Sequence, residues 1–246
     1  MAIPLMRIPF VVANTISIHA SYQAPNPTPR SQERDKYWSR DETRDWMTPV
    51  VWVVVPLLKV INIALCFCEI YMTLATVYTS LRFTPLHFIL QPRGAKTLTA
   101  LDIYFSAPFI LSSIFMYAGA YLRRLCFRTL GRHFTFELSV KEEHQLITSG
   151  PYALVRHPSY LAAAIGMLGM VIAQLLSPGS WWVESNMWGT WQGKAFGTFW
   201  VAFSACFSGS LLARVPVEDL MLRTEFKEQW KSWRLRTPYA VIPFVW

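Results

Sequence analysis

The chain has 246 residues, of which 53% are hydrophobic and only 15% are charged. Soluble domains carry about 25% charged residues, so this composition excludes an ordinary water-soluble globule. Eleven Trp and sixteen Phe exclude a disordered chain. The formal net charge of +8 does not indicate nucleic acid, because the basic residues interrupt apolar runs and form no single stripe. We therefore predict an all-α integral membrane protein.

Five apolar stretches set the expected number of transmembrane helices, because a span needs about 20 apolar residues. Uncharged stretches of this size cover residues 103–122, 158–183 and 195–213. Residues 47–78 are long enough for a span, but Lys59 and Glu69 interrupt them, so this stretch forms either one helix or two. Charged residues inside spans usually avoid lipid and face a bundle interior. Residues 4–20 are a marginal fifth span, and we expect about five transmembrane helices in all.

The lysines and arginines predict which side of the membrane each loop occupies. With five spans, residues 22–47, 123–158 and the tail from 214 share one side and hold seventeen basic residues, against five on the other side. Cytosolic loops are the ones enriched in Lys and Arg. The 123–158 connector and the C-terminal tail are therefore expected to face the cytosol.

The same two segments gather the polar side chains. Three of the five histidines lie in the 123–158 connector, and Pro158 is expected to hold His157 out of helical geometry and to open the next helix. The chain has no G-x-S-x-G elbow, H-E-x-x-H zinc motif, G-x-G-x-x-G loop or Walker A loop. Cationic, imidazole, phenolic and carboxylate groups without a nucleophile or metal motif favour group transfer from a donor that is already activated.

Two sequence patterns carry a resemblance to a known family. Residues 144–160 read H-x-L-x-x-x-G-x-Y-x-x-x-R-H-P-x-Y, and the tail runs Arg214 … Glu218-Asp219 … Phe226 … Trp230 … Trp233 … Ile242-Pro243-Phe244. Over about residues 124–245 the chain resembles the isoprenylcysteine carboxyl methyltransferase family. The resemblance implies two parts, which are N-terminal transmembrane helices at 1–123, poorly matched, and a methyltransferase core at 124–246 with two transmembrane helices and a cytosolic tail.

The resemblance also implies the cofactor and the site. S-adenosylmethionine would be bound by Glu137, His144, Gln145, Leu146, Ile147, Tyr152, His157, Pro158, Ser159, Tyr160 and Glu218. Arg214 would be the catalytic residue and would bind the substrate carboxylate. Arg156 or nearby backbone N–H groups are candidates for holding the methionine carboxylate of the cofactor. The chain departs from the family pattern at Lys227, where the family often has Gly, and at Trp230 and Trp233, where it often has Tyr.

The chemistry is consistent with these roles. A terminal carboxylate has a pKa of about 3.5 and is ionised at neutral pH, so methylation needs no general base. The expected acceptors are the C-termini of prenylated proteins in the endoplasmic reticulum membrane, or another lipophilic acid. Membrane lipids surround the chain, and neither nucleic acid nor metal is expected as a partner.

Three other functions stay open from the sequence. The acceptor can be a small lipophilic acid or a phospholipid amine, although a cationic Arg214 disfavours an amine. The chain can be a catalytically silent membrane protein of the same fold. A sterol-reductase-like enzyme that uses NADPH has a similar architecture, but the short chain and the R-H-P motif disfavour it.

Overall fold

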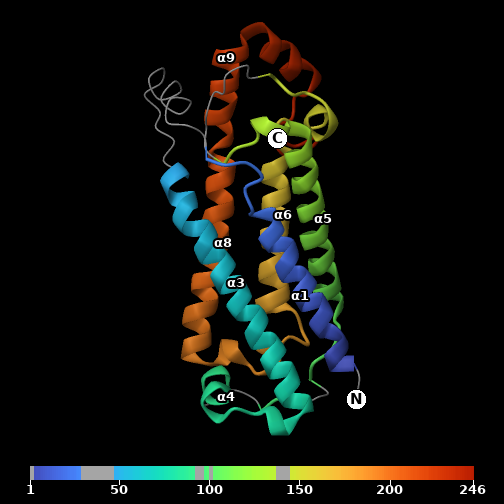
Figure 1. Cartoon of the computed structure of the whole chain (residues 1–246), viewed down its shortest axis with the longest axis vertical. Helices are drawn as coiled ribbons and strands as arrows, with labels where there is room; N and C mark the ends of the chain where they lie inside the picture. The colour runs from blue at the N-terminus through green and yellow to red at the C-terminus, as the bar shows by residue number, and fades with distance from the viewer. Residues whose placement is uncertain (1–2, 29–46, 92–96, 100–101, 137–144) are drawn as a thin grey trace. The chain divides into compact units, whose positions relative to one another are not determined.

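The computed structural model describes residues 3–28, 47–91, 97–99, 102–136 and 145–246. Every regular element among these residues is helical (Figure 1). The longer elements are α1 (Ile3–Ser21), α3 (Met47–Val77), α4 (Thr84–Leu90), α5 (Ala107–Leu130), α6 (Pro158–Val171), α7 (Trp181–Glu184), α8 (Trp191–Ala213) and α9 (Val215–Arg236). Short 3-10 turns occur at Thr79–Leu81, Gly131–His133, Gly150–Ala153 and Met187–Gly189, and residues Ile172–Leu176 are π-helical.

Three stretches of the described chain are long and apolar enough to cross a membrane. They are Val50–Val77, Pro158–Glu184 and Trp191–Arg236. The prediction of an all-α membrane protein is confirmed. The ambiguous stretch at residues 47–78 forms one helix, α3. Helices α1 and α5 form where the other two spans were expected, but neither is among the three stretches, so the count of about five spans stays a prediction.

The chain packs into two compact units, each assembled from three stretches. Unit 1 comprises Met1–Ala20, Leu58–Ala118 and Ile165–Cys206, and unit 2 comprises Ser21–Leu57, Gly119–Ala164 and Phe207–Trp246. These units are defined by packing. The division at residue 124 was defined by the extent of the family resemblance, and it stays a prediction.

Unit 2 is organised around aromatic residues that α9 packs against the connector. Trp230 and Trp233 form a buried cluster with Tyr152 and Cys126. The indole Nε1 of Trp233 also donates to the Tyr152 carbonyl at 3.0 Å. The helical spacing of the tail aromatics therefore produces a buried face on α9 that fixes the turn before α6.

Helix α9 contains one sharp departure from helical geometry. Lys227 has φ 45° and ψ −110° and divides the helix into two segments. A non-glycine residue at positive φ is strained, and this is the position at which the resembling family often has Gly. The departure from the family pattern thus falls on a backbone conformation that favours glycine.

Candidate functional site

A large cavity in unit 2 collects most of the residues that the sequence singled out. It contains about 1060 Å³ of empty space, counted with open solvent at its mouth. Among the expected site residues, Gln145, Leu146, Ile147, Tyr152, His157, Ser159, Tyr160, Arg214 and Glu218 line it. Apolar side chains of α3 and α8, which are Val51, Val55, Phe207 and Leu211, line it as well. The cavity therefore joins a polar region to an apolar one, as a site for an amphiphilic ligand requires.

The entrance to α6 has the geometry expected from Pro158. This proline is the first residue of α6, and His157 precedes the helix. The backbone N–H of His157 donates to the Ala240 carbonyl at 2.7 Å, and that of Arg156 donates to the Tyr239 carbonyl at 3.0 Å. The segment after α9 thus pairs with the R-H-P motif through its backbone.

Arg156 and His157 converge on one carboxylate, Asp219. Arg156 Nη2 donates to Asp219 Oδ2 at 2.8 Å, and Arg156 Nε lies 3.2 Å from both oxygens. His157 Nε2 lies 2.9 Å from Asp219 Oδ1. The remaining Arg156 nitrogen, Nη1, donates to the carbonyls of Thr237 and Pro238 at 3.1 and 2.6 Å. Arg156 therefore ties the motif to α9 and to the segment that follows it.

One expectation about Arg156 is not tested by this arrangement. The sequence made Arg156 a candidate for holding the methionine carboxylate of the cofactor. Its Nε, Nη1 and Nη2 atoms bond within the protein, but its side chain also lines the cavity, so that role stays a prediction. The partner that the sequence did not indicate is Asp219, which it mentioned only as a neighbour of Glu218.

Glu218 has a different environment from its neighbour. Tyr160 Oη donates to Glu218 Oε2 at 2.5 Å, and His157 Nδ1 lies 3.7 Å from the same oxygen. The rings of His157 and Tyr160 stack, with centroids 5.8 Å apart. Glu218 lines the cavity, whereas Asp219 does not. The imidazole of His157 thus lies between two carboxylates. One is that of Asp219, which also binds Arg156, and the other is that of Glu218, which lines the cavity.

Arg214 occupies the junction between α8 and α9. It is the N-cap residue of α9, and its carbonyl accepts the backbone N–H of Glu218 at 3.0 Å. The guanidinium is buried, and Nη1 donates to the Phe136 carbonyl at 2.6 Å. One helical turn separates Arg214 from Glu218, which is consistent with both residues lining the same cavity.

Arg123 is a cavity residue that the sequence analysis did not select. Its side chain is only 4% exposed and bonds to the carbonyls of Ser21 and Ser159, the latter at 3.1 Å. Its guanidinium also lies over the rings of Tyr22 and Phe136, at 5.1 and 5.5 Å from their centroids. A buried arginine beside an open cavity is a candidate for binding an anion. The sequence signal was ambiguous, because the adjacent Arg124 is exposed and the pair resembled an ordinary basic helix end.

Two phenols of the cavity stay protonated over the physiological pH range. Burial raises the pKa of Tyr22 to about 12 and raises the pKa of Tyr152 well above its usual 10. Neither phenol is ionised near neutral pH, so each offers a neutral hydroxyl and an aromatic face. Among the described residues that line the cavity, the charge is therefore set by three arginines, Arg123, Arg156 and Arg214, and one carboxylate, Glu218.

Three expected site residues are not among the cavity residues given above. Pro158 begins α6 and is not among the residues that line the cavity. Glu137 and His144 lie outside the described residues, so their expected contact with the cofactor stays a prediction.

Comparison with known proteins addresses the resemblance directly. Residues 111–182 match the model of the isoprenylcysteine carboxyl methyltransferase (ICMT) family. The predicted family resemblance is confirmed. The matched residues include Arg123 and the R-H-P motif, whereas Arg214 and Glu218 lie beyond them, so the family model does not reach the tail half of the site.

Curated relatives match a longer part of the chain. Protein-S-isoprenylcysteine O-methyltransferase B of Arabidopsis thaliana is 30% identical over 129 residues, which are 52% of this chain and 55% of that protein. Protein-S-isoprenylcysteine O-methyltransferase A of the same plant is 28% identical over 134 residues, 54% of this chain and 57% of that protein. A probable protein-S-isoprenylcysteine O-methyltransferase of Oryza sativa subsp. japonica is 27% identical over 129 residues, 52% of this chain and 56% of that protein. The chain thus spans a little over half the length of these relatives, and no solved structure matches it.

Proposed function

We propose that this protein transfers a methyl group from S-adenosylmethionine to the C-terminal carboxylate of an isoprenylcysteine, giving a methyl ester. The observation that supports this most strongly is the cavity of unit 2, which residues of the R-H-P motif line together with Arg214 and Glu218. The names of the relatives support the reaction class. The predicted asymmetry of basic residues supports a cavity that faces the cytosol, and the family supports the endoplasmic reticulum.

The groups around the cavity fit this cofactor by their chemistry. Glu218 offers a carboxylate to an amino group, and the aromatic rings of Tyr152 and Tyr160 offer stacking surfaces to an adenine or to a sulfonium. Gln145 adds an amide that can both donate and accept. When bound, the cofactor supplies an electrophilic methyl group, so the protein itself need not provide a nucleophile.

The protein's own task is to align and desolvate the acceptor carboxylate. Arg214 and Arg123 are buried cations at the cavity, and a guanidinium can hold a carboxylate through two parallel hydrogen bonds. The Phe136 carbonyl fixes one nitrogen of Arg214, which limits the directions in which the others can point. Because the carboxylate is already ionised, no proton has to be removed. The excess of arginines over carboxylates among the described residues of the cavity favours an anionic acceptor over an amine.

The apolar side of the cavity indicates where the lipophilic part of the acceptor binds. Val51, Val55, Phe207 and Leu211 offer hydrocarbon surface next to the arginines. Burial of each CH₂ group contributes about 0.8 kcal/mol, so a prenyl chain placed here would supply binding energy for desolvating the carboxylate.

The direct test uses membranes that contain the full chain, labelled S-adenosylmethionine and N-acetyl-farnesylcysteine. We expect base-labile methyl ester from the wild type and a loss of about a hundredfold or more in Arg214→Ala, by analogy with removal of an anion-binding donor. Arg223→Ala, which changes an exposed arginine on α9, is the matched control and should keep its activity.

Cofactor binding is measured in parallel. Glu218→Ala should weaken binding of labelled S-adenosylmethionine, whereas Glu228→Ala, at an exposed position of the same helix, should not. If the chain binds the cofactor but forms no ester with this substrate, the methyl acceptor would be another lipophilic molecule. A wild-type chain that neither binds the cofactor nor forms ester would be a catalytically silent protein, and the proposal would be wrong.

A further inference from the structure

Unit 1 contains a second cavity, which the proposed function does not use. It contains about 440 Å³ of empty space, counted with open solvent at its mouth, and α1, α3, α5 and the π-helical segment Ile172–Leu176 contribute to its wall. Most of the wall is hydrocarbon, but Arg7, Asn14, Glu69 and Gln174 also line it. Burying polar side chains between apolar helices costs free energy unless they are hydrogen-bonded, so the partners of each one decide whether it can bind a ligand.

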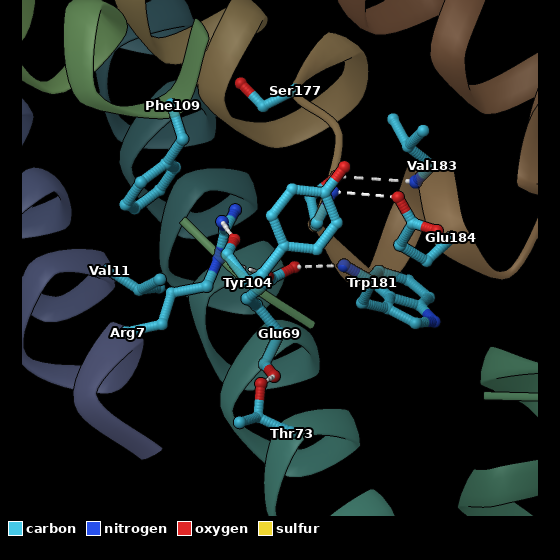
Figure 2. A network of polar contacts seen from close by, with 12 residues as sticks. Arg7, Val11, Glu69, Thr73, Tyr104, Phe109, Ser177, Trp181, Val183 and Glu184 are labelled. Atoms are coloured by element: carbon cyan, nitrogen blue, oxygen red, sulfur yellow. Dashed lines mark hydrogen bonds and ion pairs between the residues drawn. The ribbon is translucent and has the colours of Figure 1, made fainter. Parts of the chain in front are cut away.

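Arg7 and Glu69 form an ion pair (Figure 2). Arg7 Nε donates to Glu69 Oε1 at 3.1 Å, and Arg7 Nη1 donates to the Tyr104 carbonyl at 2.7 Å. The Trp181 backbone N–H donates to Glu69 Oε2 at 3.0 Å. The guanidinium also lies 3.7 Å from the centroid of the Phe109 ring. The pair therefore carries no net charge. Arg7 Nε, Arg7 Nη1 and both carboxylate oxygens of Glu69 already have hydrogen-bond partners.

Both polar atoms of Gln174 have partners within the protein. Its Nε2 donates to Asn62 Oδ1 at 2.7 Å, and its Oε1 accepts from Trp200 Nε1 at 2.9 Å. Gln174 lies in the π-helical segment, and such segments are frequent at functional sites. The amide oxygen and the amide nitrogen of Gln174 are thus each held by a neighbouring side chain.

Asn14 is different, because its hydrogen bonds fix which way its amide points. Ser113 Oγ donates to the Phe109 carbonyl at 2.8 Å, so the single hydroxyl proton is used there. Ser113 Oγ must therefore accept at Asn14, which places the Asn14 Nδ2 donor on it at 2.9 Å. The other amide atom, Asn14 Oδ1, is buried and has no hydrogen-bond partner within the described part of the chain, although Asn14 is only 6% exposed and lines the cavity.

We propose that this cavity binds a lipid alcohol, whose hydroxyl donates a hydrogen bond to Asn14 Oδ1. An acceptor needs a donor, which excludes ethers, esters and hydrocarbons as the recognised group. A charged amphiphile is disfavoured, because Arg7 and Glu69 already neutralise each other. The hydrocarbon of the ligand packs against Val11, Leu65, Phe109 and Met116, which line the same cavity.

The experiment uses the full chain in lipid nanodiscs with photoreactive, alkyne-tagged probes. Two alcohols, one linear and one sterol, are each compared with their own methyl ether, which has the same shape but no donor. Cross-linked peptides are then identified by mass spectrometry. We expect at least one alcohol to label peptides of α1, α3 or α5 in unit 1 about tenfold more than its ether, because the ether would leave a buried acceptor without its hydrogen bond.

Chain variants make the assignment specific. Asn14→Leu keeps the size of the side chain and removes the acceptor, so labelling by the alcohol should fall to the level of the ether. Ser17→Ala lies on the same helix, where Ser17 bonds to the Ala13 carbonyl, and should leave labelling unchanged.

Two outcomes would overturn the inference. Equal labelling by both alcohols and their ethers would mean that only water satisfies Asn14 Oδ1, and this comparison needs no variant. Selective labelling that persists in Asn14→Leu would place the recognised hydroxyl elsewhere. Both outcomes are independent of methyl transfer, so they leave the proposed function untouched.

Discussion

Replacing Asp219 with Asn tests whether the contacts of Asp219 with Arg156 and His157 support the cofactor site. The change keeps the shape of the side chain but removes its charge, and it presents an NH₂ group to Arg156 or His157. Asp219 is contacted by Arg156 Nη2 at 2.8 Å and by His157 Nε2 at 2.9 Å. One of these donors would lose its acceptor in the variant.

The size of the effect follows from burial. Breaking a fully buried ion pair costs about 3–5 kcal/mol. The Asp219 side chain is 17% exposed and that of Arg156 is 7% exposed, so water partly screens the loss. Arg156 also keeps its bonds to the Thr237 and Pro238 carbonyls. We therefore expect the free energy of unfolding to fall by about 2–3 kcal/mol, with a rise of about tenfold or more in the Kd for S-adenosylmethionine, because His157 would no longer be held against Glu218.

The assay measures denaturant unfolding in detergent and cofactor binding on the same preparations. Glu228→Gln is the control, since Glu228 is 80% exposed and pairs with Lys231, which is 54% exposed. Such surface pairs contribute about 1 kcal/mol or less. Asp219→Glu restores the charge and should recover part of the cofactor affinity. An Asp219→Asn variant that matches the Glu228→Gln control in both measurements would refute the reasoning.

Three further outcomes follow from local geometry. Lys227→Gly should raise the stability by about 1 kcal/mol in the same unfolding assay, because φ 45° is strained for lysine, and a loss of stability would contradict this. Gly169→Ala should destabilise by about 2 kcal/mol or more, because its Cβ would lie 2.6 Å from the Ser112 carbonyl oxygen, whereas Gly209→Ala meets nothing within 4 Å and should be neutral or stabilising. Burial raises the pKa of the Cys126 thiol to about 11, so the thiolate absorbance that the wild type has in excess of Cys126→Ala should be small at pH 9 and still rising at pH 10; a thiolate signal that is complete by pH 9 would exclude the raised pKa.

The helices were predictable because their signals are local. Long uncharged runs predicted α5, α6 and α8, and Pro158 marked the first residue of α6. The ambiguity at residues 47–78 arose from Glu69, whose partner Arg7 lies 62 positions away in the chain. No local pattern contains that pair, so the sequence could not distinguish a helix that buries a charge from two helices that flank one.

The cavity was predictable only where residue type and motif agreed. Tyr152, His157, Tyr160, Arg214 and Glu218 were selected by pattern, and all five line it. Arg123 was missed because its role depends on burial, and burial depends on the three-dimensional approach of Ser21 and Ser159. A charge count treats Arg123 and the exposed Arg124 alike.

Glu218 and Asp219 illustrate why adjacent, similar residues need the structure to separate them. Successive positions on a helix point about 100° apart, since there are 3.6 residues per turn, so one of the two faces the cavity and the other faces the R-H-P motif. The family resemblance selected Glu218, but it gave Asp219 no partner. The structure gives Asp219 two, Arg156 and His157, and through His157 it connects both carboxylates. A double-mutant cycle between them should therefore show coupling, because their shared imidazole cannot keep its alignment to one oxygen when the other is removed.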